Sequence, residues 1–307
     1  MAEFLDLAGA AYSWLYGLGN ALLIRLEYPA ATCAAFLVLE LVLPRQRNSW
    51  QSYWRGARFI ATAIAINTLV LTALVMLSGI DQVAAGMPTS PPHKPLALLD
   101  LAPLTSSPDW WTRAAGYAVA TLGVAALSDF FYYWMHRAQH GVGLLWRFHR
   151  VHHSITELNA TNNYHHVAED VFQFACVTAP MSFLLGVESG PVPWLVIVLV
   201  NTHSYFIHST VNLNIGPLRY IFSDNRLHRI HHSIVEPHHR DRNFATALPL
   251  WDVLFRTAYF PRRDEWPAVG LVDVAEPATI ADYLLMPLHD DATVADRKRR
   301  ALASANT

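Results

Sequence analysis

Histidines at helical spacing are the residues of this chain best suited to chemistry. The 307 residues include 16 histidines, and three short motifs hold several of them each: HRAQH at 136–140, HRVHHS at 149–154 and HRIHHS at 228–233. Positions i, i+3 and i+4 of a helix share one face, so each motif would direct its imidazoles the same way. Imidazole is the commonest metal ligand in proteins. The motifs therefore predict a metal-centred protein.

So many clustered imidazoles indicate two adjacent first-row transition ions. A structural zinc site needs only four ligands and usually includes cysteine, whereas calcium and magnesium prefer oxygen ligands. The chain has only Cys33 and Cys176, and it lacks a CxxC or CxxCH motif for an iron–sulfur cluster or attached haem. Iron is the natural ion for oxygen activation, because zinc has no redox chemistry. Zinc could still replace iron in purified protein, because the order of affinities does not favour Fe²⁺.

The composition predicts an integral membrane protein. Hydrophobic residues make up 53% of the chain and charged residues only 15%, against about 25% charged in soluble domains. We expect five apolar stretches of roughly spanning length: Tyr28–Leu43, Ala57–Ile80, Ala114–Met135, Val171–Val187 and Val192–Ile207. The stretch from Phe4 to Leu26 is interrupted by polar residues and glycines and is interpreted as an interfacial helix. Acidic Glu3 and Asp6 follow Met1, so no cleavable signal peptide is expected.

The distribution of arginines predicts the topology. The loop after the first stretch carries Arg45, Arg47, Arg55 and Arg58, which favours a cytoplasmic location. The next loop, 81–113, has six prolines and little basic charge, so it fits the opposite side. If each further apolar stretch crosses the bilayer in the opposite direction to the one before it, all three histidine motifs and the C-terminus lie on the cytoplasmic side. The net charge of −2 and the lack of a basic stripe apart from the run at 297–300 give no support to nucleic-acid binding.

The motifs and their surroundings resemble the fatty-acid hydroxylase / sterol desaturase superfamily of integral-membrane di-iron enzymes. Its pattern is HxxxH, HxxHH and a further HxxHH, in the order found here. Other parts of the pattern are matched by His166 three residues before Glu169, by Phe206-Ile207-His208, by Asp241-Arg242-Asn243-Phe244 and by the WDVLFRT segment at 251–257. The resemblance covers roughly residues 110–287. Ala245 stands where the family usually has glycine, and Tyr164-His165 where an arginine often precedes the histidine.

The resemblance implies an all-α integral-membrane helical bundle with a cytoplasmic helical cap that holds a histidine-rich dimetal site. We divide the chain into N-terminal transmembrane helices and linker (1–113), a catalytic domain (114–287) and a polar tail (288–307). The expected cofactor is two non-haem iron ions. The expected metal ligands are the motif histidines together with two that the resemblance adds: His136, His140, His149, His152, His153, His166, His208, His228, His231 and His232.

The expected activity is O₂-dependent hydroxylation or desaturation of a lipid C–H bond. Since these 307 residues include no cytochrome b5-like segment, the electrons would come from an external donor of the ferredoxin, cytochrome b5 or reductase type. A non-redox dimetal (zinc) membrane hydrolase is one alternative. A membrane metal carrier or sensor is another, although a carrier would place ligands along a path through the bilayer rather than at one depth.

Further residues near the motifs are assigned from their types and positions. His165 and His203 are possible but less favoured ligands, and His238 and His239 are interpreted as facing solvent or a substrate headgroup. Asp129 lies within a span, where a carboxylate costs about 2.5–3.5 kcal/mol, so we expect it to orient a ligand histidine or to make an interhelical hydrogen bond. Asn243 and Asp252 are expected to hold the scaffold by hydrogen bonds.

Overall fold

A computed structural model describes residues 2–78, 98–185, 191–234 and 237–289. The described residues form helices and loops, with two isolated β-bridges and no β-strand among them, which confirms the all-α prediction. The elements are α1 (Ala2–Val42), α2 (Trp50–Ser78), α4 (Ala102–Thr105), α5 (Trp110–Gly141), α6 (Gly143–His153), α7 (Glu169–Gln173), a π-helix η1 (Phe174–Thr178), α8 (Ala179–Leu185), α9 (Pro191–His208), η2 (Gly216–Tyr220), α10 (Asn225–His231), η3 (Pro237–His239), α11 (Leu250–Leu254), α12 (Ile280–Leu285) and η4 (Met286–Leu288).

Two of the described helices are long and apolar enough to cross a membrane. The segments are Trp50–Ala73 in α2 and Trp110–Gly141, which is the whole of α5. Only 17% and 33% of their most apolar windows are buried, and the exposed residues include Val119 and Leu122. An apolar helix that the protein leaves uncovered is suited to lipid. The chain is therefore a membrane protein, and the five-span topology stays a prediction.

Two predicted segments differ in the structure. The stretch 4–26 is not a separate helix, because α1 continues without a break from Ala2 to Val42 and includes Pro29. The stretch 171–187 is helical without a break as far as Leu185, where the described segment ends, but α7, η1 and α8 form it in succession rather than one regular α-helix. A π-helix inserts an extra residue into the turn, so this segment changes its helical hydrogen bonding at Phe174.

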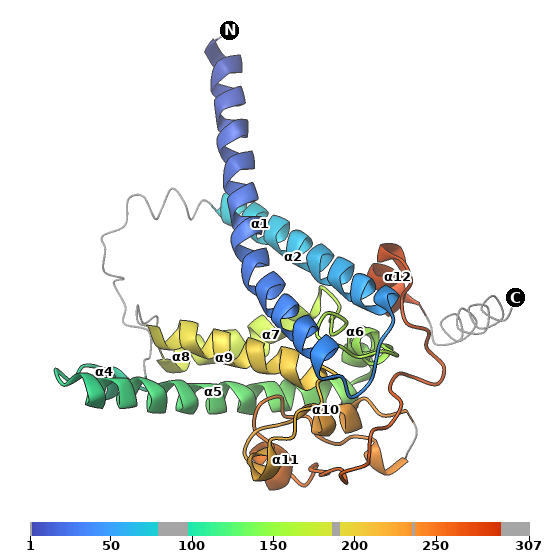
Figure 1. The fold of residues 1–307 in the computed structure, drawn as a ribbon. Helices are drawn as coiled ribbons and strands as arrows, with labels where there is room; N and C mark the ends of the chain where they lie inside the picture. Colours follow the sequence, from blue (N-terminus) through green and yellow to red (C-terminus); the bar gives the residue numbers. More distant parts are fainter. Residues whose placement is uncertain (1, 79–97, 186–190, 235–236, 290–307) are drawn as a thin grey trace, which may run out of the picture.

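The long helices bring their ends together at one side of the molecule, where α6, α10 and α12 form a cap (Figure 1). The C-terminal ends of α1, α5 and α9 and the N-terminal end of α2 all lie there, beside α6, α10 and α12. Helices α5 and α9 pack against each other, and α10 packs on α9. Val142 caps both α5 and α6, so the chain turns directly from the membrane-spanning helix into the cap.

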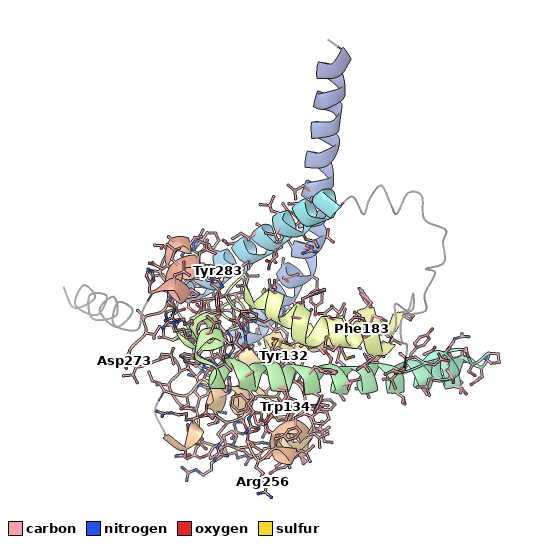
Figure 2. The ribbon with its side chains drawn as sticks, turned by 180° about the vertical axis from the view of Figure 1, so that it is seen from behind. Tyr132, Trp134, Phe183, Arg256, Asp273 and Tyr283 are labelled. Atoms are coloured by element: carbon pink, nitrogen blue, oxygen red, sulfur yellow. The ribbon has the colours of Figure 1, made fainter. Side chains whose placement is uncertain are left out.

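Aromatic packing fixes the cap on the bundle. Phe59 of α2 stacks on Tyr283 of α12 with ring centroids 4.9 Å apart, and it also meets Tyr164 edge-on at 4.8 Å. On α5, Trp134 packs edge-on against Phe255 at 4.8 Å, on the flank where Figure 2 labels it. Aromatic pairs of this geometry add roughly 0.5–1.5 kcal/mol each beyond the area they bury.

A close approach at Gly56 holds the loop that leads to the candidate site. A Cβ atom at this position of α2 would lie 2.0 Å from the Thr161 carbonyl oxygen, so only glycine allows the contact. The same loop is held by Asn162, whose amide donates to the Glu157 carbonyl at 3.1 Å and to the Glu276 carboxylate at 2.9 Å. Loop 157–166 is therefore fixed against α2.

Candidate metal centre

The first of two histidine groups in the cap contains five imidazoles. Its ligand atoms all lie within 4.8 Å of one another, and its members come from α5, α6 and α10: His136, His140, His149, His153 and His231. The Nε2 atoms of His136 and His149 are 2.9 Å apart. The Nε2 atom of His153 lies 3.1 Å from those of both His140 and His149. We call these residues the five-histidine group.

The second group contains four imidazoles, all of them buried. Its members come from α6, α9, α10 and the residue that caps α10, and they again lie within 4.8 Å: His152, His208, His228 and His232. The Nε2 atom of His208 is 3.2 Å from that of His152 and 2.9 Å from that of His228. The Nε2 atoms of His228 and His232 are 3.1 Å apart. We call these residues the four-histidine group.

Helical spacing explains why the two groups are adjacent. Positions i and i+4 of each HxxHH motif lie nearly in line along a helix, whereas position i+3 is rotated to one side. Helix α6 accordingly contributes His149 and His153 to the five-histidine group and His152 to the four-histidine group. The third motif is divided the other way: His228 and His232 belong to the four-histidine group and His231 to the five-histidine group. The rings of His153 and His232, one from each group, are stacked with centroids 4.3 Å apart. The motifs thus build two neighbouring sites rather than one site each.

The spacing of the ring nitrogens fits a shared metal ion in each group. Two imidazole nitrogens bound to one first-row ion at about 2.0–2.1 Å lie about 2.9–3.4 Å apart, depending on the coordination geometry. The six Nε2–Nε2 separations given above lie between 2.9 and 3.2 Å. Neutral imidazoles cannot all hydrogen bond at such a cluster, because each has one donor nitrogen. Metal ions therefore account for the donor set better than hydrogen bonds do.

Backbone carbonyls select the ring tautomer that a metal ion needs. The Nδ1 atom of His136 donates to the Phe244 carbonyl at 2.7 Å, that of His208 to the Ser204 carbonyl at 2.7 Å, and that of His231 to the Arg242 carbonyl at 2.8 Å. A proton placed on Nδ1 leaves the lone pair on Nε2, which faces into the group. These three histidines are therefore held ready to bind through Nε2.

A buried carboxylate adjoins the five-histidine group. Glu169 Oε2 lies 2.9 Å from His149 Nδ1 and 3.1 Å from His165 Nδ1, and it accepts a bond from Gln139 Nε2 at 2.6 Å. Burial by itself would raise the pKa of Glu169, but the interactions with His149 and His165 outweigh it and hold the pKa well below its usual value. The carboxylate is thus charged and could offset part of the charge of bound cations.

Burial keeps the cap histidines neutral. It lowers the pKa of each of them well below the usual value, and neighbouring imidazoles add to the effect by disfavouring a further positive charge; this holds for His152, His153, His228, His231 and His232. A neutral imidazole is the form that binds a metal ion. The groups are therefore in the ligand form well below neutral pH.

The structure does not bring His166 to either group. Its Nε2 atom lies 3.2 Å from the Leu284 carbonyl oxygen, and its Nδ1 atom accepts a bond from the amide of Ala168. Its neighbour His165 is the one that stacks on His152, with centroids 3.8 Å apart. His165 Nδ1 also lies 3.1 Å from Glu169 Oε2, so His165 rather than His166 adjoins the grouped imidazoles.

Other predicted residues serve the scaffold. Asp129 accepts bonds of 2.8–3.0 Å from the backbone amides of Thr246, Ala247 and Leu248. It therefore anchors the loop that follows Phe244 and does not contact a ligand histidine directly. Asp252 accepts from the amides of Phe244 and Ala245 at 2.8 and 2.9 Å. This carboxylate thus fixes the carbonyl that orients His136.

Asn243 and His239 also have structural partners. The Asn243 side chain bonds to the backbone of Leu227 and Tyr259 at 2.8–2.9 Å, as expected for a scaffold residue. The prediction that His239 faces solvent or a headgroup is wrong, because this side chain is buried and lies 2.8 Å from both Ser233 Oγ and Glu265 Oε1. His238 is exposed. His203 belongs to neither histidine group.

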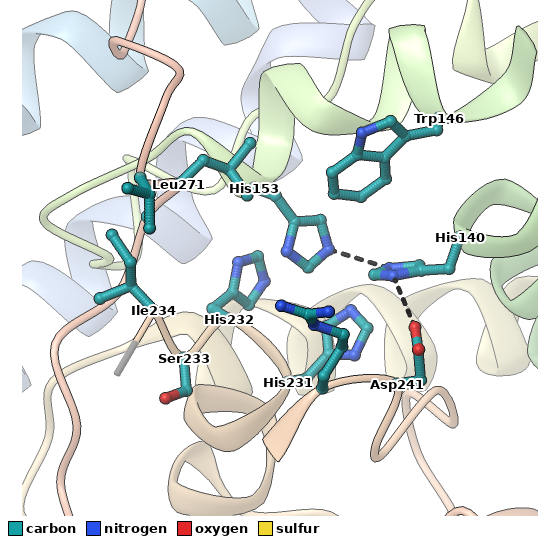
Figure 3. Close-up of a pocket in the computed structure, with 12 residues that line it drawn as sticks. His140, Trp146, His153, His231, His232, Ser233, Ile234, Asp241 and Leu271 are labelled. Carbon is teal, nitrogen blue, oxygen red and sulfur yellow. Dashed lines mark hydrogen bonds and ion pairs between the residues drawn. The ribbon is translucent and has the colours of Figure 1, made fainter. Parts of the chain in front are cut away.

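A polar pocket opens directly onto the five-histidine group (Figure 3). It has a volume of about 430 Å³, and His140, His153, His231 and His232 form part of its wall. Trp146 and Asp241 lie on either side of His140, and Asp241 Oδ1 is 3.9 Å from His140 Nδ1. A molecule in this pocket would be in contact with the imidazoles.

Comparison with known proteins agrees with this geometry. Residues 121–257 match the family model for fatty acid hydroxylase. The ornithine lipid hydroxylase OlsE of Rhizobium tropici is 31% identical over 252 residues, which cover 78% of this chain and 69% of the relative. Human alkylglycerol monooxygenase is 29% identical over 58% of this chain and 38% of its own length.

More distant relatives share a smaller part of their length. The rice very-long-chain aldehyde decarbonylase GL1-6 is 28% identical over 48% of this chain, but only 24% of the relative is covered. No solved structure matches the chain. The extent of the match to the bacterial hydroxylase and the position of the family model together show that the chain belongs to the fatty acid hydroxylase family and is an oxidoreductase of lipid metabolism.

Proposed function

We propose that the chain is a membrane-bound, O₂-dependent di-iron enzyme that hydroxylates a C–H bond of a lipid. The observation that carries this proposal is the pair of adjacent histidine groups, with nine inward-facing imidazoles at metal-binding separations. The names of the relatives, a lipid hydroxylase and an alkylglycerol monooxygenase, support both the lipid substrate and the use of oxygen.

The proposed ligand set consists of the nine grouped histidines. His136, His140, His149, His153 and His231 would hold one iron ion, and His152, His208, His228 and His232 the other. His166 is left out because both of its ring nitrogens have other partners. The iron pair, when bound, supplies the redox chemistry that imidazole and carboxylate side chains lack. Zinc would fit the same nitrogens but would leave the protein without this chemistry.

The overall reaction sets what the protein must provide. A lipid R–H, O₂, two electrons and two protons give R–OH and water, so one oxygen atom enters the new C–O bond and the other leaves as water. The protein must therefore bind the lipid, exclude bulk water and receive electrons. The buried imidazoles and Glu169 hold the ions, and the carbonyls of Phe244, Ser204 and Arg242 fix the ring orientations.

We propose that residues 114–287 are the catalytic unit, with the helices of 1–113 beside it and 288–307 as a tail. The arginine-rich segment 45–58, which joins the end of α1 to α2 and includes the first turns of α2, lies at the same side as the histidine groups. By the charge rule this side faces the cytoplasm, where a ferredoxin, a cytochrome b5 or a reductase could deliver the electrons.

The test is turnover under ¹⁸O₂. The full chain is loaded with Fe²⁺ in lipid nanodiscs, supplied with a chemical or flavoprotein reductant, and the lipids are analysed by mass spectrometry. We expect products with one ¹⁸O atom, and none without O₂ or reductant. A product that lacks two hydrogens would instead establish a desaturase. Modification under anaerobic conditions, or oxygen derived from water, would refute the oxygenase reaction.

A further inference from the structure

We propose that the polar pocket beside the five-histidine group binds a zwitterionic lipid headgroup, with Arg240 facing its anionic part and Asp241 its cationic part. The C–H bond that reacts would then lie in the headgroup or in the carbons next to it, rather than deep in the acyl chain. This inference rests on the proposed function and specifies its substrate class.

The first argument is that the pocket at the histidines is polar. Its wall includes four imidazoles, Ser233 and two residues of opposite charge, Arg240 and Asp241. Trp146 and Leu271 supply part of its apolar surface. A volume of about 430 Å³ falls within the usual range of about 300–1,000 Å³ for sites of small ligands. An acyl chain placed there would leave these polar groups without partners, which costs free energy.

The second argument is the adjacent pair of charges. Arg240 and Asp241 follow each other in sequence, and both are exposed. An anionic and a cationic side chain at one pocket suit a ligand that carries both charges. No headgroup of a single charge would be matched by both residues.

The third argument is the backbone at Asp241. Its φ is +56°, in the left-handed region that few residues other than glycine occupy, although asparagine and aspartate are enriched there. This backbone directs the carboxylate towards His140 and the pocket (Figure 3). Residues held in uncommon conformations are concentrated at functional sites, which favours a binding role for this carboxylate.

The apolar cavity of the bundle lies elsewhere. A volume of about 310 Å³ between α5, η1, α8 and α9 has an apolar wall that includes Val124, Met181 and Val196. None of the nine grouped histidines lines it. Its wall on α5 extends to Ser128, which precedes His136 by about 12 Å along the helix. An acyl chain fits this cavity, and its carbons would then be remote from the metal centre.

A third described cavity does not change the assignment. It holds about 340 Å³ between α1, α2 and α9, and its wall includes His165, His166 and Asp170 but none of the nine grouped histidines. Among the described cavities, the polar pocket is therefore the one whose contents would touch the five-histidine group.

The experiment compares lipids whose headgroups differ in charge. Iron-loaded full-length protein in nanodiscs receives four lipids with matched acyl chains: a phosphatidylethanolamine, an N-acyl lysine with free carboxylate and ammonium, a phosphatidylglycerol and a diacylglycerol. We expect a kcat/KM at least tenfold higher for one or both zwitterions, which separates phosphate from carboxylate recognition. Tandem mass spectrometry should place the added oxygen in the headgroup or its adjacent carbons.

Variants of the charge pair provide a second readout. Arg240→Gln and Asp241→Asn should each weaken binding of a short-chain zwitterionic lipid to the iron-free protein about tenfold, and should raise KM with little change in kcat. Asparagine tolerates the backbone of position 241, so folding is not at stake. Arg263→Gln, at another exposed arginine outside the pocket, is the matched control and should bind as the wild type does.

The outcomes separate this inference from the proposed function. Oxygen found within the acyl chain, or equal binding of all four lipids by wild type and variants, would overturn the headgroup site while leaving the oxygenase intact. Absence of any O₂-dependent product would refute the proposed function itself. A change in iron content in Asp241→Asn would assign Asp241 to orienting His140, and binding by Arg240→Gln would then decide the headgroup site.

Discussion

The two histidine groups differ in access and in charge, although they are built from the same motifs. The five-histidine group lines the polar pocket through His140, His153 and His231, and His140 is only half-buried, whereas the four-histidine group lines it through His232 alone and all four of its members are buried. The chain therefore places two sites of similar nitrogen chemistry in different surroundings.

The partners of the rings show the difference in charge. In the five-histidine group, His149 bonds to the Glu169 carboxylate, and His140 faces Asp241 at 3.9 Å. In the four-histidine group, His152 and His208 bond to neutral backbone carbonyls at 3.0 and 2.7 Å. A carboxylate partner makes an imidazole a stronger donor to a cation. We call the metal position of the five-histidine group the open position and that of the four-histidine group the enclosed position. We infer that a cation at the open position gains electrostatic support from these carboxylates, whereas one at the enclosed position depends on burial and geometry.

The largest effect should come from removing one ligand of each group. His231→Ala should empty the open position and His232→Ala the enclosed one, because each group loses a nitrogen that no other residue replaces. We expect turnover below about 1% of wild type for both, and a metal content close to one ion in place of two. His152→Ala should resemble His232→Ala. Metal analysis and lipid turnover, with membrane insertion as a check of folding, measure these effects.

His203→Ala is the matched control for these variants, since His203 lies on α9 near His208 but in neither group. It should retain both ions and most of the activity. Full metal content and activity in His231→Ala or His232→Ala would mean that these residues do not bind the ions.

Sequence reasoning identifies the grouped histidines because helical periodicity is local. The HxxxH and HxxHH motifs predict which imidazoles share a face, and nine of the ten predicted ligands lie in the two groups. Periodicity does not show that each HxxHH motif divides between the groups, because that depends on how α6 and α10 face each other. Nor does it decide between His165 and His166, since they occupy a loop whose path is set by contacts with α2 such as the one at Gly56.

The apolar stretches show a similar limit to how far the fold can be predicted from the sequence. Hydropathy predicts where apolar residues gather, but not whether a helix continues through Pro29 or changes hydrogen bonding at Phe174. Those outcomes depend on neighbouring helices rather than on composition. The buried carboxylate Asp129 is recognisable from sequence as needing partners, yet its partners are backbone amides more than 100 residues away.

A smaller and more selective effect is expected from Glu169→Gln. This change retains the shape of the side chain but removes the charge that accepts from His149 Nδ1. The affinity of the open position should fall about 10–100-fold, as is typical when the partner of a ligand histidine is changed, and the enclosed position should keep its ion. Titration with a competing chelator resolves the two affinities.

Asp170→Asn is the control for Glu169→Gln, because it removes a charge at the next position, where the carboxylate is exposed and bonds to Asn67. Both affinities should remain at the wild-type level in this control. Equal weakening of the two positions by Glu169→Gln would contradict the inferred difference in charge between the groups.

The smallest effect should be the acid sensitivity of the iron-free protein. Burial lowers the pKa of the cap histidines in both groups, including His152, His231 and His232, whereas in the unfolded chain they take up protons near pH 6.5. The unfolded state therefore binds more protons below that pH, and the free energy of unfolding falls as the pH is lowered from 7.5 to 5. Each kcal/mol lost should lower the melting temperature by about 2–4 °C.

Single substitutions compare the groups in this assay. His232→Gln and His231→Gln each remove one buried neutral imidazole, so both should reduce the loss of melting temperature between pH 7.5 and 5. We expect the larger reduction for His232→Gln, because His232 is only 1% exposed whereas His231 is 7% exposed, so water reaches a protonated His231 more readily. Equal reductions would show that the polar pocket hydrates His231 no better than His232, and a melting temperature that rises on acidification would contradict burial in the neutral form.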